Sequence, residues 1–232
     1  MVEIEHPRGS SLLIRHVQKF EIKDKTEVPL QINMDRYTKG TGRLGNPTTH
    51  ITLKEKGKDT STYFVDQYSP TMKDPIRFYL DGLQEFEHGY QRKSIFPIVY
   101  RKSDSKLFIF TNIWHSDIFL SRITELKPNV DTTETSFDFE DFTSIPEIKN
   151  IWGVWEKVNL PHKKTNASFG PQVNQSVDVK LSQATSVNLK MEISGKLYTL
   201  TVSKNGRISS AQKLTKEELI KLYDDYFKSY LK

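Results

Sequence analysis

Apolar and polar residues alternate along several stretches of the chain, in the pattern of half-buried β-strands. Apolar side chains occupy every second position of residues 28–34, and residues 50–53 and 60–68 are rich in β-branched or aromatic side chains. The side chains of a strand point alternately to its two faces, so this pattern predicts strands with one buried face. Residues 76–86 fit a short helix and a strand equally well. The first half of the chain is therefore predicted to consist mainly of strands.

The clearest local signal is a β-hairpin. An apolar run over residues 95–100 is followed by a polar stretch, 101–106, and by a second aromatic and β-branched run over 107–113. Two such runs around a short polar turn predict an antiparallel pair. Pro97 has no N–H group to donate to a neighbour, so its strand is expected at a sheet edge or bulged at that residue.

The last third of the chain combines alternating strands with one amphipathic helix. Residues 187–193 and 197–202 alternate as strands do. Thr215 is placed to cap a helix, and Glu218 three residues later completes a capping box. One broad apolar face of this helix is made of Leu219, Leu222, Tyr223, Tyr226, Phe227 and Tyr230. The chain is therefore predicted to be an α+β protein, with a mainly antiparallel β-sheet or open barrel and a C-terminal amphipathic helix.

Charge is distributed unevenly along the chain, whose formal net charge is +5. Residues 1–125 carry 19 Lys and Arg against 16 Asp and Glu, residues 126–150 carry 2 against 6, and residues 151–232 carry 13 against 7. Basic surfaces attract phosphate polymers because binding releases their counterions. Two basic regions on either side of an acidic one therefore favour a nucleic acid as partner, with ordinary surface solvation as the alternative.

The acidic region also suggests where the domains begin and end. It is rich in Thr, Asp, Glu and Ser and shows little periodicity, which is typical of a linker. We expect a β-rich N-terminal domain over 1–126, an acidic linker or long loop over 127–148, and a sheet with the C-terminal helix over 149–232. The last part is expected either to pack as one domain with the first or to stand apart.

The composition excludes several kinds of catalytic and metal-binding site. The 232 residues include no cysteine, which excludes disulfides, Cys-ligated zinc and thiol nucleophiles. The six histidines show no pair at metal-binding spacing, so any metal would need the oxygen ligands that suit Mg²⁺. The sequence has no apolar run of about 18 residues and no signal-peptide pattern. We therefore expect a cytoplasmic protein that binds no membrane and, unless it is a Mg²⁺ enzyme, no cofactor.

A glycine-rich loop with basic residues is the first candidate for a binding site. Residues 40–45 fit the pattern G-x-G-x-x-G, but a strand-like run follows instead of the helix that a dinucleotide fold needs. Exposed backbone N–H groups and basic side chains suit such a loop to phosphate contacts. A second predicted loop, 161–174, adds two lysines. The candidate nucleic-acid-binding residues are Arg36, Lys39, Gly40, Gly42, Arg43, Lys163 and Lys164. The alternative is a plain turn that uses glycine for positive φ angles.

Short acid-x-Lys patterns raise a second hypothesis, a Mg²⁺-dependent endonuclease. In that chemistry two acids hold the metal ion and a lysine lies near the attacking water. Asp178 and Lys180 form the best-placed triplet on a predicted strand, with Glu156 as an upstream acid. These three residues are the catalytic candidates, and Mg²⁺ is the cofactor they would need. A chance match of so short a pattern is the alternative.

One segment resembles a known family. From Gly89 to Ile113 the chain has a glycine, an apolar strand with a Pro-x-Val sequence, a charged turn and a second apolar strand. Together with the glycine–arginine loop over 40–45, it resembles the N-terminal DNA-binding modules of McrB-type modification-dependent restriction systems. The resemblance implies DNA binding in which a modified base leaves the stack and enters an aromatic pocket. The chain departs from that family in having Pro47-Thr48-Thr49-His50 where the family tends to have a Pro-Trp pair.

Three functions follow as hypotheses. The first is a DNA-binding protein of a restriction or phage-defence system, which contacts phosphates through basic loops and reads bases with aromatic loop residues. The second is a Mg²⁺-dependent endonuclease of the restriction type. The third is a non-enzymatic protein-interaction or phage structural module, in which the basic residues serve only solvation. DNA is the expected partner in the first two.

Overall fold

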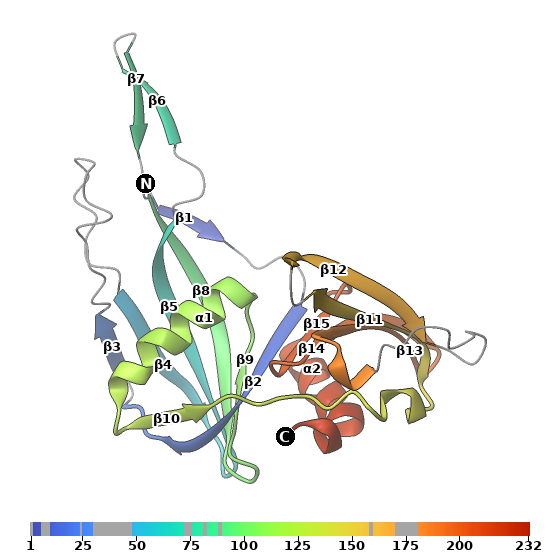
Figure 1. Ribbon diagram of the computed structural model, residues 1–232. Coiled ribbons are helices and arrows are strands. Elements are labelled where there is room, and N and C mark those ends of the chain that lie inside the picture. The colour runs from blue at the N-terminus through green and yellow to red at the C-terminus, as the bar shows by residue number, and fades with distance from the viewer. Residues whose placement is uncertain are drawn as a thin grey trace. The chain divides into compact units, whose positions relative to one another are not determined.

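The computed structural model describes residues 2–5, 10–23, 25–29, 48–71, 76–80, 83–87, 90–157, 160–169 and 181–232. The chain divides into two compact units, both built mainly from β-strands (Figure 1). The first unit comprises Met1–Pro7 and Val17–Thr132, and the second comprises Arg8–His16 and Thr133–Lys232. Strand β2 (Ser10–Phe20) therefore belongs to the second unit over residues 10–16 and to the first unit over residues 17–20.

The first unit is organised around an antiparallel path of strands in the order β9-β8-β5-β4-β3. Strand β1 adds a parallel pair to β8, and β10 pairs with β2. The strands are β1 (Val2–Glu5), β3 (Lys25–Pro29), β4 (Thr48–Lys56), β5 (Thr60–Thr71), β6 (Ile76–Leu80), β7 (Leu83–Glu87), β8 (Tyr90–Arg101), β9 (Lys106–Ile109) and β10 (Val130–Thr133). The strands predicted over 50–53 and 60–68 are confirmed, and the ambiguous segment 76–86 forms the hairpin β6–β7.

Pro97 lies inside the sheet rather than at its edge. Strand β8 pairs with β5 along its whole length, and on its other side it pairs with β1 over Gln91–Ser94 and with β9 over Ile98–Arg101. Pro97 falls between these two pairings, where its missing N–H costs no ladder hydrogen bond. The prediction of an edge strand or a bulge at Pro97 is therefore wrong. The lack of an N–H group is nevertheless accommodated, because Pro97 lies in a gap of the hydrogen-bond ladder.

Helix α1 (Ile113–Ile123) covers one face of this sheet (Figure 1). The side-chain oxygen of Asn112 caps the helix by accepting a hydrogen bond from the His115 N–H at 2.9 Å. On the sheet side, the Phe119 ring packs edge-on against Phe96, with 5.7 Å between ring centres. The sequence pattern did not predict this helix, because the apolar run over 107–113 resembles one continuous strand. In the structure the strand ends at Ile109 and the cap residue redirects the chain.

The same helix buries a charged side chain. Arg122 is 0% exposed, and its guanidinium donates a hydrogen bond to the Thr49 hydroxyl on β4 at 2.5 Å. Burial disfavours the charged form and lowers the pKa of Arg122 to about 10, while the nearby Glu125 carboxylate acts in the opposite direction. The guanidinium thus fixes α1 against β4 in the interior of the first unit.

The second unit is a fully antiparallel sheet in the order β12-β11-β13-β14-β15-β2. Its strands, besides β2, are β11 (Ile148–Lys157), β12 (Leu160–Phe169), β13 (Ser186–Ile193), β14 (Lys196–Ser203) and β15 (Arg207–Ser210). The predicted alternation is confirmed on β13, where Val187, Leu189 and Met191 are each 0% exposed. These side chains form the core of the unit.

A C-terminal helix packs on this core. Helix α2 (Lys216–Leu222) starts with the predicted capping box, in which the Glu218 N–H donates to Thr215 Oγ1 and the Thr215 N–H donates to the Glu218 carboxylate. The chain continues as a π-helical turn, Tyr223–Phe227, and a short 3-10 turn, Lys228–Tyr230. Within the predicted apolar face, the buried members are Leu219, Leu222, Tyr223 and Phe227. Both the helix and its buried face are therefore confirmed.

The segment predicted to be an acidic linker, 127–148, supplies core side chains to the second unit. Phe137, Phe139 and Phe142 are at most 1% exposed, and the Phe142 ring centre lies 5.7 Å from that of Phe227. Backbone hydrogen bonds join Ser136 to Lys232 in both directions, at 3.0 and 2.9 Å. The boundary between the units falls at Thr132/Thr133, and the segment is irregular in backbone but packed.

The predicted fold class is confirmed. The protein is an α+β protein with mainly antiparallel strands and a C-terminal amphipathic helix. Among the residues that the structure describes, no helix has the length and apolar character needed to cross a membrane.

Candidate nucleic-acid interface

Most of the residues predicted to bind nucleic acid lie outside the described part of the chain. These are Arg36, Lys39, Gly40, Gly42 and Arg43, in the glycine-rich segment. Two of the three catalytic candidates, Asp178 and Lys180, also lie outside it. The interface must therefore be sought among other residues.

The two lysines of the second predicted loop lie in a strand instead. Lys163 and Lys164 belong to β12, so the prediction of a loop over 161–174 is wrong for residues 161–169. Strand β12 pairs with β11, and Lys164 stands opposite Glu156 in the register. Pro161 and the polar run favour a loop locally; the pairing of residues 164–169 with β11 extends the strand, and Pro161 itself lies where the register is interrupted. As the last strand in the sheet order, β12 also tolerates proline.

Glu156 is the one catalytic candidate whose backbone position is described. It lies on β11, opposite Lys164 and next to a β-bulge between Glu156 and Lys157. Across the described ranges, no group of three or more histidine, aspartate or glutamate side chains is placed to hold a metal ion. No described residue therefore adds to the nuclease hypothesis.

Two hairpin turns lie side by side at one end of the first unit. The turn between β4 and β5 follows Lys56, and the turn between β8 and β9 follows Arg101. The Lys102 N–H of the second turn donates to the Asp59 backbone carbonyl of the first at 2.9 Å. We call residues 54–59 and 101–106 together the turn end; Figure 1 shows these turns at the bottom of the first unit.

Two of the three acidic side chains of the turn end bind neighbouring residues, while the third, Glu55, is exposed. The Asp59 carboxylate accepts two hydrogen bonds from Ser103, one from its backbone N–H and one from its hydroxyl, both at 2.8 Å. The Asp104 carboxylate pairs with the Arg101 guanidinium, at 3.0 Å from Nε and 2.5 Å from the second nitrogen. This two-point contact is the geometry in which arginine binds carboxylates best. Both acids thereby hold the turns in shape.

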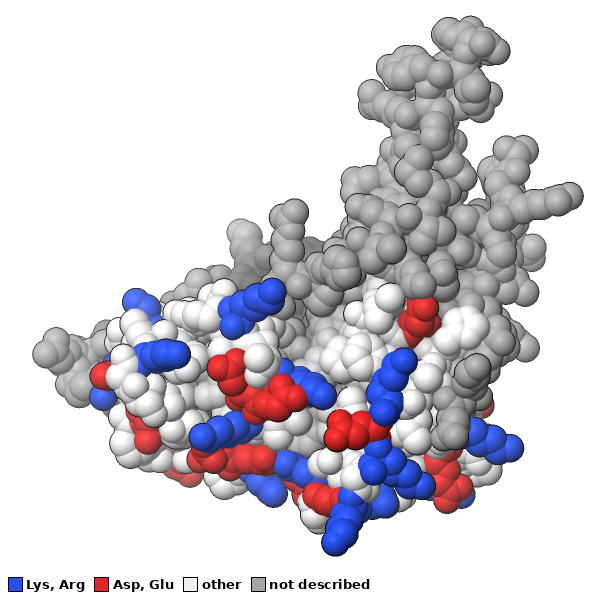
Figure 2. All heavy atoms as spheres, turned by 180° about the vertical axis from the view of Figure 1, so that it is seen from behind, with Lys and Arg blue, Asp and Glu red and all other residues white. Residues whose placement is uncertain are grey.

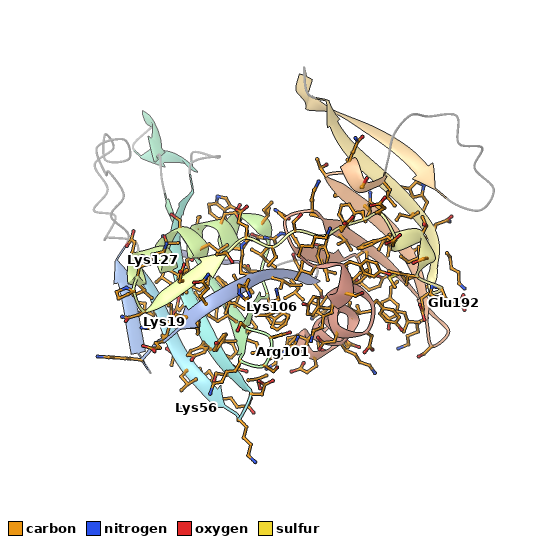
Figure 3. All side chains as sticks on the ribbon, turned by 60° about the horizontal axis from the view of Figure 1, so that its bottom comes forward. Lys19, Lys56, Arg101, Lys106, Lys127 and Glu192 are labelled. Carbon is orange, nitrogen blue, oxygen red and sulfur yellow. The ribbon has the colours of Figure 1, made fainter. Side chains whose placement is uncertain are left out.

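Four of the five lysines of the turn end are exposed to water, and one of them, Lys54, lies over the Phe64 ring. Lys56, Lys58 and Lys102 are exposed, and none of them forms an ion pair with any residue that the structure describes. The turn end contains six basic residues against three acidic ones. Figure 2 shows basic and acidic side chains interspersed over the described surface, with basic ones at its lowest point, and Figure 3 labels Lys56, Arg101 and Lys106.

This arrangement suits contact with phosphates. An exposed lysine carries its charge on a flexible stem and presents three N–H donors, so it reaches phosphate oxygens without a fixed geometry. The paired turns give these lysines a rigid base. The turn end therefore resembles the backbone-contacting part of a nucleic-acid interface, which positions the polymer without reading its sequence.

Sequence reasoning did not single out the turn end. Asp59 and Ser103 are 44 positions apart in the chain, and only the pairing of β5 with β8 brings them together. The run Lys54-Glu55-Lys56-Gly57-Lys58-Asp59 was a visible local signal, with glycine marking a turn and lysine at every second position. The alternating charges of this run do not reveal that the Asp59 carboxylate is bound by Ser103.

Comparison with known proteins adds no relative. No model of a protein family matches the chain, and no curated protein matches it. The candidate interface therefore rests on the geometry of the described residues.

Proposed function

We propose that this protein binds DNA, with the turn end of the first unit contacting the phosphate backbone. The observation that carries the proposal is the division of roles at the turn end. Asp59 and Asp104 hold the turns, while Lys56, Lys58 and Lys102 remain available to a polyanion. The resemblance to restriction-system modules supports a restriction or phage-defence setting, which would place the protein in the cytoplasm with the DNA.

The proposed mechanism is electrostatic positioning. Each lysine that neutralises a phosphate releases a counterion, so the binding constant for duplex DNA falls with salt by a slope of about 0.9 per contact. Lysines on two joined turns present several such contacts from one rigid surface. Base reading would fall to aromatic residues near the loops, as the sequence analysis expects.

A salt titration with matched variants tests the proposal. Binding of a labelled duplex is measured by fluorescence anisotropy between 50 and 200 mM salt, for the wild type and for the triple variant Lys56→Ala, Lys58→Ala and Lys102→Ala. We expect the triple variant to bind on the order of 10²-fold more weakly at 0.1 M salt and to lower the salt slope by about 2.7.

The control removes the same charge from the second unit. Lys149, Lys216 and Lys232 each form an ion pair there, so their replacement by alanine should change affinity far less. Binding that is absent or independent of salt would overturn the proposal. Equal losses in the two triple variants would show that net charge alone, and not the turn end, attracts the DNA.

A further inference from the structure

The face of the first unit's sheet that points away from α1 exposes apolar side chains. Phe96 on β8 faces the helix and packs on Phe119. Because side chains alternate along a strand, the neighbours Ile95 and Pro97 face the other way. Phe64 on β5 stands directly opposite Pro97 in the antiparallel register and shares its face. Phe64 and Ile95 are each 39% exposed.

These residues are close enough to form one patch. Phe64 and Pro97 are a directly opposed pair, and Ile95 is the diagonal neighbour of Phe64 across the same two strands. Opposed and diagonal residues of an antiparallel pair lie within reach of an aromatic side chain. Clustered apolar side chains on an open sheet face mark a binding surface more often than isolated ones do.

A β-bulge brings a lysine to the edge of this patch. The register between β4 and β5 passes from Leu53 opposite Tyr63 to Glu55 opposite Thr62, which leaves Lys54 without a cross-strand partner. Bulges of this kind redirect a side chain. The Lys54 Nζ lies 5.8 Å from the centre of the Phe64 ring, and Lys54 forms no ion pair in the described chain. A cation thus stands beside an exposed aromatic ring.

We propose that Phe64 stacks on an unpaired base of single-stranded DNA, while Lys54 and the other lysines of the turn end hold the neighbouring phosphates. This inference rests on the proposed function and deepens it by naming the form of DNA. In a duplex the faces of the bases are covered by their neighbours, so a ring on an open sheet face suits a strand whose bases are unstacked.

Distance and charge support a nucleic acid rather than a protein on this face. Phe64 lies four residues from Thr60, where β5 begins, which is about 13 Å along a strand. A single strand of a few nucleotides would span the ring and the turn end together, within the site sizes common to small β-barrels. A hydrophobic protein partner would bury Phe64 equally well, but Lys54 beside the ring and the exposed lysines of the turn end favour a polyanion.

The test compares single-stranded and duplex probes on the same variants. The probes are a labelled oligodeoxythymidine and a duplex of equal length, and the variants are Phe64→Ala, Phe64→Trp and, as control, Leu197→Ala. Leu197 is 54% exposed and lies on β14 of the second unit. We expect Phe64→Ala to weaken single-strand binding by about 5- to 150-fold and to leave duplex binding within about twofold. Leu197→Ala should match the wild type on both probes.

Phe64→Trp supplies a readout that a purely structural role would not change. It should retain single-strand affinity, and its added indole fluorescence should be quenched when a base stacks on it. Unchanged single-strand affinity in Phe64→Ala, or an equal loss on both probes, would overturn stacking at Phe64 while leaving DNA binding by the turn end intact. Absence of binding to either probe in the wild type would overturn both proposals.

Discussion

The lysines of the turn end in the first unit and three lysines of the second unit differ in how their charges are paired. At the turn end, two of the three acids bind nearby donors, Asp59 to Ser103 and Asp104 to Arg101. The exposed lysines there therefore keep their charge unpaired. In the second unit, several lysines are themselves paired with acids: Lys149 with Glu192 at 3.7 Å, Lys216 with Glu217 at 3.4 Å, and Lys232 with Asp138 at 2.6 Å.

Net charge alone would favour the second unit as the one that binds DNA. The second unit has 16 Lys and Arg against 12 Asp and Glu, and the first has 18 against 17. The unpaired lysines of the second unit include Lys196, Lys213 and Lys221, which lie on β14, on the loop before α2 and on α2. A polyanion binds best where several cations lie close together. The first unit has the smaller net charge, but its turn end brings several lysines together. A unit's overall charge therefore does not locate its binding surface.

The acidic segment belongs to the second unit from Thr133 onward, and its packing provides the largest expected effect. Phe142→Ala should lower the free energy of unfolding by about 3–5 kcal/mol, because it leaves a cavity where a fully buried ring now packs. Its ring centre lies 5.1 Å from those of Phe139 and Tyr230. Urea unfolding followed by circular dichroism measures the change.

The exposed Leu197 supplies the control for this measurement. Leu197→Ala should change stability by no more than about 0.5 kcal/mol. If Phe142→Ala changed stability as little as Leu197→Ala, the acidic segment would behave as the free linker that its composition suggests. Its carboxylates would then not belong to the second unit, and the net charge of that unit would have to be calculated without them.

Local rules predicted the elements whose signals lie close together in the sequence. The capping box of Thr215 and Glu218 and the alternation of Val187, Leu189 and Met191 involve neighbours within a few positions. Each such element forms for reasons contained in its own segment, so both are confirmed by the structure.

Features that depend on tertiary pairing could not be predicted in this way. Phe137, Phe139 and Phe142 follow no helical or strand period, because an irregular backbone carries them into the core. Strand β12 forms through its pairing with β11, which is interrupted around Pro161. The turn end combines two turns that are distant in sequence. The candidate site could therefore be recognised only from the tertiary contacts of Asp59.

The second prediction tests whether Asp59 holds the turns together. Asp59→Ala removes the acceptor of two hydrogen bonds from Ser103 and should cost about 1–2 kcal/mol of stability, as expected for bonds to a charged group near the surface. Asp117→Ala is the matched control, since Asp117 is an exposed acid of the same unit with no such bond. Equal stability of the two variants in urea would mean that Asp59 is not engaged by the turns.

The smallest effect is expected from an exposed ion pair of the second unit. Asp138 accepts hydrogen bonds from the Lys232 ammonium at 2.6 Å and from the Glu140 N–H at 3.1 Å. These two bonds, the first above all, lower the pKa of Asp138 from its usual value of 3.8. The pair is largely open to solvent, so Asp138→Asn should cost less than about 1 kcal/mol at neutral pH.

The pH dependence gives this small effect a definite sign. A carboxyl whose pKa is lower in the folded state stabilises the protein above its unfolded pKa, and the stabilisation is lost as the pH falls through the folded pKa. The difference in urea midpoint between wild type and Asp138→Asn should therefore stay constant from pH 7 to about 5 and shrink below about 4. A difference that grows on acidification would show that Lys232 is not paired with Asp138. Only two of the three ion pairs that distinguish the second unit from the turn end would then remain.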